Sequence, residues 1–291
     1  MKETAVALGN FDGVSKAHKK LIETLAAAAK DKSLYSVAFI FETHPLRVLR
    51  GDTYKVLMTN EKKREILLSL GIDEVIFEPT TKELLGMSPE AFAKDVLRDR
   101  FSAKTVAAGF NYTFGRGGAG DAALLKKLGE KYGFEAIIMD DIKDGDETVS
   151  STVLKAALSA GDIIKYNRFS YMPYSIKGEV EHGKSLGHKK LFPTANVTPP
   201  DFLYLPKSGV YKTETQVLGK KYKSITNIGV NPTVEQAKKR SETYIPSFSG
   251  DIYGETIEVT FLEKIRDEHK FKNTDELKKQ LQKDIDSVFN G

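Results

Sequence analysis

Apolar residues in the first half of the chain recur with two different spacings. Short runs such as Thr4–Leu8 are almost entirely apolar, which is typical of buried strands, whereas His18–Lys30 carries apolar residues on one helical face. The other strands expected here are Ser36–Phe41, Glu74–Phe77, Thr105–Ala108 and Ala136–Met139, and the other helices are Asn60–Leu70, Pro89–Arg100, Leu124–Tyr132 and Val153–Leu158. Alternating strands and helices predict a parallel sheet covered by helices, which is an α/β fold.

The pattern changes after about residue 170. Strand-like segments separated by turn residues follow, namely Tyr174–Val180, Gly209–Val217, Tyr222–Ile228 and Thr256–Phe261. A helix is expected at Asn273–Val288, where leucine and isoleucine recur at helical spacing. The second half therefore predicts a small antiparallel β-barrel with a C-terminal helix. We place one domain in residues 1–160 and the other in residues 170–291.

Composition excludes several classes of site. The 291 residues contain no cysteine, which rules out disulfides, thiolate catalysis, zinc fingers and iron–sulfur clusters. With only five histidines, the metal to expect is a hard ion held by oxygen ligands. A net charge of +4 suits phosphorylated small molecules but falls short of the basic surface of a nucleic-acid binder. No apolar run approaches the ~20 residues that span a bilayer, and the N-terminus does not resemble a signal peptide, so we expect a cytoplasmic protein without membrane or nucleic-acid partners.

Four polar or glycine-rich segments follow predicted strands of the first half, at residues 9–14, 41–45, 109–121 and 150–155. The first segment begins with Gly9, Asn10, Phe11, Asp12 and Gly13. It precedes a helix whose free N–H groups and positive dipole end suit a phosphate, and His18 stands at that helix start. Taken alone, this segment is better explained as a strand–helix turn with a surface histidine. Four such segments at the carboxyl ends of strands in one sheet indicate a nucleotide site.

The second half carries a different set of polar residues. Thr194 and Asn196 are two residues apart and face the same side of an extended segment, so together they can hold a Mg²⁺ ion that also binds ATP phosphates. A preceding segment with Gly183 and Gly187 can wrap a phosphate, and Glu242 can serve as a general base. From these residues alone, a β-barrel with a Thr-Asn turn and one solvated glutamate is an equally open interpretation.

The first 155 residues resemble the adenylyltransferase half of bacterial FAD synthetases, the bifunctional riboflavin kinase/FMN adenylyltransferase family. The motifs that carry the resemblance are, in order, GNFDG with a later His, HP, GFNYTFG, GD and SST. The resemblance implies a Rossmann-like nucleotidyltransferase domain that uses ATP and FMN, with His18 as a catalytic residue. The nucleotide-binding residues it implies are Gly9, Asn10, Phe11, Asp12, Gly13, Ser151, Thr152 and Lys155, and the flavin-binding residues are His44 and Asn111.

From about residue 170 to the end, the chain resembles the riboflavin kinase module of the same family. The motifs are FPTAN, LPKSGVY, NIGVNPT, SET, GDIYG and IRDEHKF. The resemblance implies riboflavin and Mg²⁺-ATP as substrates, with Thr194 and Asn196 at the metal and Glu242 as the base on the terminal ribityl hydroxyl. It also implies nucleotide contacts at Gly183 and Gly187.

The chain departs from the family pattern in both halves. The family's His-x-Gly-His loop reads Ser15-Lys16-Ala17-His18 here, and Lys155 replaces an arginine whose planar fork would hold phosphate bidentately. In the second half, His188 and Leu191 replace a basic residue and a glycine before the Phe-Pro-Thr motif. Two alternatives therefore stay open beside a bifunctional enzyme: a paralog with one of the two activities, and a flavin- or nucleotide-binding regulatory protein with little catalysis.

Overall fold

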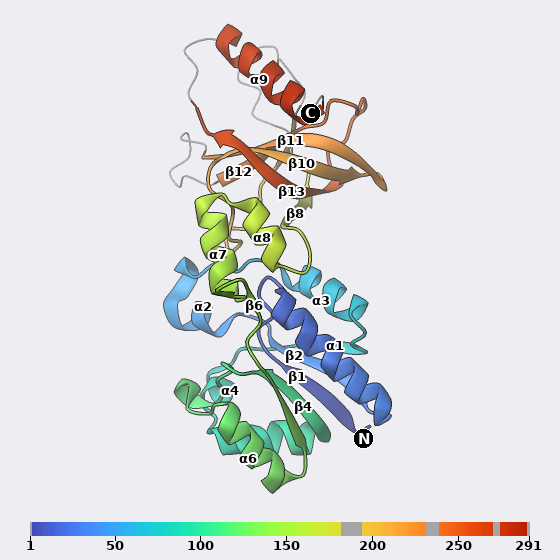
Figure 1. The fold of residues 1–291 in the computed structure, drawn as a ribbon, viewed down its shortest axis with the longest axis vertical. Helices are drawn as coiled ribbons and strands as arrows, with labels where there is room; N and C mark the ends of the chain where they lie inside the picture. Colours follow the sequence, from blue (N-terminus) through green and yellow to red (C-terminus); the bar gives the residue numbers. More distant parts are fainter. Residues whose placement is uncertain (1, 182–193, 231–238, 270–273, 290–291) are drawn as a thin grey trace. The chain divides into compact units, whose positions relative to one another are not determined.

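The structure is a computed structural model that describes residues 2–181, 194–230, 239–269 and 274–289 (Figure 1). The chain divides into two compact units, Met1–Ser151 and Thr152–Gly291. Within the described residues, none of the helices combines the length and the apolar character that a membrane span requires.

The first unit is built on a five-stranded parallel sheet, as predicted. Its strands are β1 (Thr4–Leu8), β2 (Tyr35–Phe41), β3 (Glu74–Glu78), β4 (Ala103–Gly109) and β5 (Glu135–Met139). Their order is β3-β2-β1-β4-β5, so the chain moves outward from β1 to β3 and then returns to the other side of β1. The order reverses between β1 and β4, and in open parallel sheets the loops after such strands diverge and leave a ligand crevice.

Helices cover this sheet, and several short elements were not expected from the sequence. The long helices are α1 (Lys16–Asp31), α3 (Asn60–Ser69), α6 (Ala122–Tyr132) and a helix that begins as α5 (Pro89–Ala91) and continues as the π-helical η2 (Phe92–Arg100). The short elements are α2 (Pro45–Arg50), η1 (Gly51–Thr53), α4 (Lys82–Gly86), η3 (Arg116–Gly118) and the hairpin β6 (Lys143–Asp144) and β7 (Glu147–Thr148). The predicted helices and strands of this half are confirmed to within a few residues at their ends.

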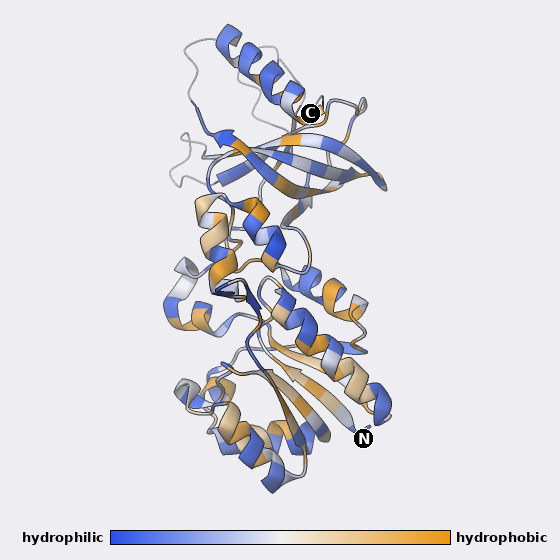
Figure 2. Ribbon diagram, viewed as in Figure 1, coloured by the Kyte–Doolittle hydropathy of each residue, from blue (hydrophilic) through white to orange (hydrophobic). Residues whose placement is uncertain are grey.

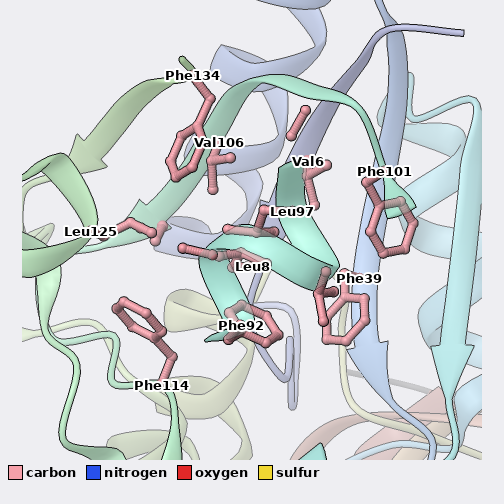
Figure 3. Packing of buried hydrophobic residues seen from close by; sticks show 14 of the residues in the cluster. Val6, Leu8, Phe39, Phe92, Leu97, Phe101, Val106, Phe114, Leu125 and Phe134 are labelled. Carbon is pink, nitrogen blue, oxygen red and sulfur yellow. The ribbon is translucent and has the colours of Figure 1, made fainter. Parts of the chain in front are cut away.

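An aromatic cluster fills the space between one face of the sheet and the helices η2 and α6 (Figure 3). Phe39 of β2 meets Phe92 and Phe101 edge to face, each at 5.8 Å between ring centroids. Val6 and Leu8 of β1 point into the same cluster. Figure 2 shows β1, β2 and β4 mainly in hydrophobic colours, which agrees with strands buried on both faces. A rigid sheet of this kind holds the loops at its carboxyl edge in place.

The second unit is a curled antiparallel sheet with helices, which confirms the predicted barrel-type fold. Its elements are α7 (Ser151–Ala160), α8 (Ile163–Phe169), β8 (Ser175–Glu179), β9 (Thr194–Val197), β10 (Gly209–Val217), β11 (Lys220–Val230), β12 (Lys239–Tyr244), β13 (Thr256–Asp267) and α9 (Thr274–Phe289). The strand order is β8-β13-β10-β11-β12-β9. The edge strands β8 and β9 approach each other because Gly178 has no side chain: a Cβ there would lie 2.5 Å from Val197 Cγ1.

The helix α9 is attached to this sheet by one buried ion pair and a small apolar cluster. Asp284 of α9 is 2% exposed and receives hydrogen bonds from the Arg266 guanidinium of β13 at 2.8–3.1 Å. Val288 packs beside this pair against Val210 and Ile225. Most of α9 appears in hydrophilic colours in Figure 2, so these few contacts define the face by which it docks.

Hydroxyl groups, rather than apolar groups alone, fill part of the barrel interior. Hydrogen bonds of 2.7–2.9 Å connect five of them in one chain. In order along that chain they are Thr215, Ser224, Thr213, Thr226 and Thr243, and each is at most 1% exposed. A buried hydroxyl is tolerated when it has a hydrogen-bond partner. Because the five hydroxyls are linked in series, removal of one would deprive its neighbours of a hydrogen bond.

The replacement Thr226→Val is expected to destabilise the second unit. Valine has a similar volume but leaves the hydroxyls of Thr213 and Thr243 each without the partner they have at 2.9 Å, at a cost of about 1–3 kcal/mol. Equilibrium urea unfolding measures the change. The matched control is Thr256→Val at the exposed start of β13, which should change stability by less than about 0.5 kcal/mol. Equal decreases in the free energy of unfolding of the two variants would contradict a structural role for the hydroxyl chain.

Candidate functional site

A cavity of about 270 Å³ lies in the first unit at the carboxyl ends of β1, β4 and β5. This is the crevice that the strand order predicts. The site residues predicted from the sequence that line it are Gly9, Asn10, Phe11, Asp12, His18, His44, Asn111 and Ser151. Polar segments that are far apart in the sequence therefore meet at one place, which is the arrangement that we inferred from four segments following strands.

The loop after β1 forms the floor of this cavity and is conformationally strained. Phe11 has a φ of 48° and Val14 a φ of 31°, in a region that side-chain-bearing residues rarely adopt. The Phe11 ring folds back onto Gly9, where a Cβ would lie 3.1 Å from the ring. Asp12 is 3% exposed, and its carboxylate accepts a hydrogen bond of 2.7 Å from the backbone N–H of Leu57. That bond ties the loop to the segment before α3 and helps to hold the strained conformation.

His18 stands on the first turn of α1, facing the cavity. The N-cap of this helix is Ser15, whose hydroxyl accepts a hydrogen bond of 3.4 Å from the backbone N–H of His18. In return, the backbone N–H of Ser15 donates to Nδ1 of His18 at 3.2 Å. The imidazole also meets the Phe11 ring edge-on, with 5.3 Å between centroids. The ring is therefore held from two sides.

Burial lowers the pKa of His18 from its ordinary value of 6.5 to about 4. The negative charge of Asp12 opposes this shift, and the positive charge of Lys63 adds to it. Lys63 is itself buried at 3% exposure, on α3. His18 is consequently a neutral imidazole at physiological pH, and it can act toward an anion as a hydrogen-bond donor rather than as a cation.

We expect the imidazole of His18 to titrate near pH 4 in the folded chain and near pH 6.5 in urea. Between those values the unfolded chain binds a proton that the folded chain does not, so the stability of the fold falls as the pH is lowered from about 6.5 toward 4. NMR titration of the histidine ring protons measures both midpoints, and the spectrum of His18→Gln assigns the signal. A folded-state midpoint of 6.5 or above would contradict a desolvated His18.

The cavity lining also includes groups suited to a planar ligand. His44 caps α2 by accepting the Leu46 N–H at Nδ1 (3.2 Å), and its ring stacks on Tyr54 with 4.5 Å between centroids. Phe110, at the end of β4, is 47% exposed although it lines the cavity. Burial raises the pKa of Tyr112 well above its usual range, so its phenol stays protonated and can donate.

Two acidic residues of the cavity were not singled out from the sequence. Asp140 and Asp141 directly follow β5 and line the cavity. The sequence signal that could have identified these two residues is their position directly after a predicted strand. The same signal identified the other polar segments.

Other predicted residues of the adenylyltransferase site are not brought to this cavity by the described structure. Gly13 belongs to the loop after β1 but does not line the cavity. Thr152 and Lys155 lie on α7 and belong to the second unit. Gly183 and Gly187, which were predicted to contact the nucleotide of the kinase module, lie outside the described residues.

The second unit aligns its predicted site residues across two neighbouring strands. Glu242 of β12 is directly opposite Asn196 of β9, and Tyr244 is directly opposite Thr194. Directly opposite residues in an antiparallel pair project from the same face of the sheet. On its other side Glu242 is opposite Asn227 of β11. The predicted metal-binding and base residues are therefore neighbours on one face.

These side chains offer oxygen ligands that suit Mg²⁺, with most of the remaining ligands supplied by the phosphates of a bound nucleotide. Asn196 is 6% exposed, and its amide N–H donates to the backbone carbonyl of Thr194 at 3.2 Å, which leaves its amide oxygen as an acceptor. The described residues contain no group of three or more His, Asp or Glu side chains that could hold a metal ion by themselves. Mg²⁺ commonly uses one or two protein oxygens together with phosphate oxygens and water.

Comparisons with known proteins find relatives for both halves of the chain. The family model for FAD synthetase matches residues 1–153, and the model for riboflavin kinase matches residues 170–290. The bifunctional riboflavin kinase/FMN adenylyltransferase of Escherichia coli K12 is 32% identical over 281 residues, which cover 96% of this chain and 90% of that protein. The protein of the same description from Listeria monocytogenes is 33% identical over 282 residues, 96% of this chain and 89% of its own length.

A solved structure has the same fold over the whole chain. It is described as a macrolide-efflux protein from Streptococcus pneumoniae and is 29% identical, with a TM-score of 0.87 over 100% of this chain and 94% of that one. Two family models in succession, and relatives that match from end to end, establish the relationship. The chain belongs to the bifunctional riboflavin kinase/FMN adenylyltransferase family.

Proposed function

We propose that this protein phosphorylates riboflavin to FMN in residues 170–291 and adenylylates FMN to FAD in residues 1–160, using ATP and Mg²⁺ in both reactions. The observation that carries the proposal is the succession of two family models, FAD synthetase and then riboflavin kinase, each of which covers a unit with its own polar site. The enzyme is thus a transferase of flavin nucleotide biosynthesis with two separate reaction centres.

In the kinase reaction, Glu242 acts as the general base. It accepts the proton of the terminal ribityl hydroxyl while that oxygen attacks the γ-phosphorus of ATP, and the bond to the β–γ bridging oxygen breaks to release ADP. Glu242 is exposed, and no hydrogen bond or ion pair occupies its carboxylate among the described residues. A solvent-accessible carboxylate of this kind supports the role because it can reach a hydroxyl and accept its proton.

Thr194 and Asn196 hold the metal in this proposal. Their side-chain oxygens would hold a Mg²⁺ ion, which would supply positive charge to the ATP phosphates. The direct pairing of Asn196 with Glu242 supports it, since the phosphate to be transferred and the base must both lie beside the attacking hydroxyl.

In the adenylyltransferase reaction, a phosphate oxygen of FMN attacks the α-phosphorus of ATP and pyrophosphate leaves. The N-terminus of α1 and His18 face the cavity where the phosphates bind in this proposal, and both offer N–H donors to them. Phe110 and His44, which line the same cavity, offer rings to the flavin or the adenine. The Ser15 departure should lower the rate more than the affinity, because the missing histidine acts on charge that develops during transfer.

Incubation of the purified chain with riboflavin, ATP and Mg²⁺, followed by chromatography of the flavins, tests this proposal. We expect both FMN and FAD to form. Formation of FMN alone would support the single-activity alternative. Bound but unconverted flavin would support the regulatory alternative and contradict the proposal as a whole.

A further inference from the structure

Ser15 contacts His18 through both its backbone and its side chain. Its N–H donates to Nδ1 at 3.2 Å, and its Oγ lies 3.2 Å from the same nitrogen. A peptide N–H can only donate, so Nδ1 must be an acceptor without a proton. A neutral imidazole carries one proton, which therefore resides on Nε2.

The same argument determines the direction of the hydrogen bond between the Ser15 hydroxyl and Nδ1. Because Nδ1 carries no proton, Oγ must donate its hydrogen to Nδ1, while its lone pair accepts the His18 backbone N–H at 3.4 Å. Ser15 is 0% exposed, so water does not compete for these bonds. Two donors on one ring nitrogen, and the Phe11 edge beside the ring, restrict both the tautomer and the rotation of the imidazole.

The other ring nitrogen is available to a ligand. His18 lines the cavity, and in the described part of the chain every hydrogen bond to its ring is made at Nδ1. The Nε2–H group is thus a neutral hydrogen-bond donor of fixed orientation. It belongs to the cavity in which nucleotide phosphates bind in the proposed function.

We propose that Ser15 is a positioning residue for adenylyl transfer, which fixes His18 as an Nε2–H donor to the nucleotide phosphates. This inference rests on the proposed function of the first unit. As the FMN oxygen–phosphorus bond forms and the bond to pyrophosphate breaks, the donor stabilises charge on the phosphate oxygens, and no proton leaves the ring. The serine that replaces the family's first histidine thus supplies no phosphate contact of its own but organises the histidine that does.

Ser15→Ala tests the role, with Ser88→Ala as the matched control. Ser88 caps the helix that begins at Pro89, accepts the Ala91 N–H at 3.1 Å, and does not line the cavity. Both variants lose one serine N-cap of similar value. We expect Ser15→Ala to lower kcat for FAD formation from FMN about 10- to 100-fold with KM values within about twofold, because a misplaced donor affects the transition state more than binding. Ser88→Ala should leave kcat unchanged.

The tautomer of His18 in the wild-type chain provides a second readout that a merely structural cap would not determine. Nitrogen-15 shifts at pH 7 should show a protonated Nε2 and an unprotonated Nδ1. A proton on Nδ1 would overturn the proposal, and so would a kcat for Ser15→Ala within twofold of Ser88→Ala. A wild-type chain that forms no FAD at all would instead refute the proposed adenylylation, and the role of Ser15 with it.

Discussion

Replacement of Glu242 by glutamine is expected to lower kcat for riboflavin phosphorylation by about 1000-fold or more, because general-base contributions are typically 10²–10⁴. The amide fills nearly the same volume but cannot accept the proton of the attacking hydroxyl. Glu242 is exposed on its strand, so the change should leave the fold and the ATP affinity nearly intact. Initial rates of FMN formation and calorimetric ATP binding measure the two effects separately.

Glu214→Gln is the matched control for this prediction. Glu214 lies on β10 of the same sheet and makes a surface ion pair with Lys221 at 2.9 Å, which contributes little to stability. It should retain wild-type kinase activity. If Glu242→Gln turned over within a few-fold of wild type, another group would have to be the base.

Asn196→Leu is expected to lower kinase activity about 10²-fold or more at ordinary Mg²⁺ concentrations, because it deletes the oxygen that would hold the ion in our proposal. Leucine has a similar size and suits the buried position, since Asn196 is only 6% exposed. Thr194→Val should act in the same direction. Kinase rates measured across a magnesium titration reveal the effect as a raised metal requirement.

The adenylyltransferase reaction of the same variants serves as the internal control. In our proposal that reaction uses the cavity of the first unit, so FAD formation from added FMN should follow the wild-type magnesium curve. Unchanged kinase titrations in both Asn196→Leu and Thr194→Val would exclude the metal from this face of the sheet.

The architecture of the first unit could be predicted because its signals are local. Apolar runs such as Thr4–Leu8 determine buried strands, and the carboxyl ends of parallel strands meet at one edge whatever the loop lengths. The convergence of residues 9–12, 109–113 and 150–151 on one cavity follows from that geometry. The short helix α2 was missed, since six residues give too little periodicity to be recognised.

The candidate sites depended on contacts that sequence patterns do not determine. The pairing of Glu242 with Asn196 is a matter of strand register, and a shift by one residue would place them on opposite faces. The bond from Leu57 to Asp12 connects two loops with no common motif. The sequence shows Ser15 only as a departure from the family's His-x-Gly-His loop, and its bonds to His18 are visible only in the structure.

The interior of the second unit shows why the alternation of polar and apolar residues is ambiguous there. Thr213 and Thr215 on β10 look like solvent-facing residues, yet both are buried because hydroxyls from β11 meet them at 2.7–2.9 Å. Threonine suits a strand on either face when a partner is available.

In our proposal one chain carries two separate transferase sites, and the adenylyltransferase motifs depart most from the family pattern at Ser15, Ala17 and Lys155. The most direct test of this proposal is to supply the wild-type chain with FMN, ATP and Mg²⁺, without riboflavin, and to quantify FAD and pyrophosphate. We expect the two products in equal amounts, formed at the same rate by the wild-type chain and by Glu242→Gln. Absence of FAD from a folded chain that still converts riboflavin to FMN would contradict the account.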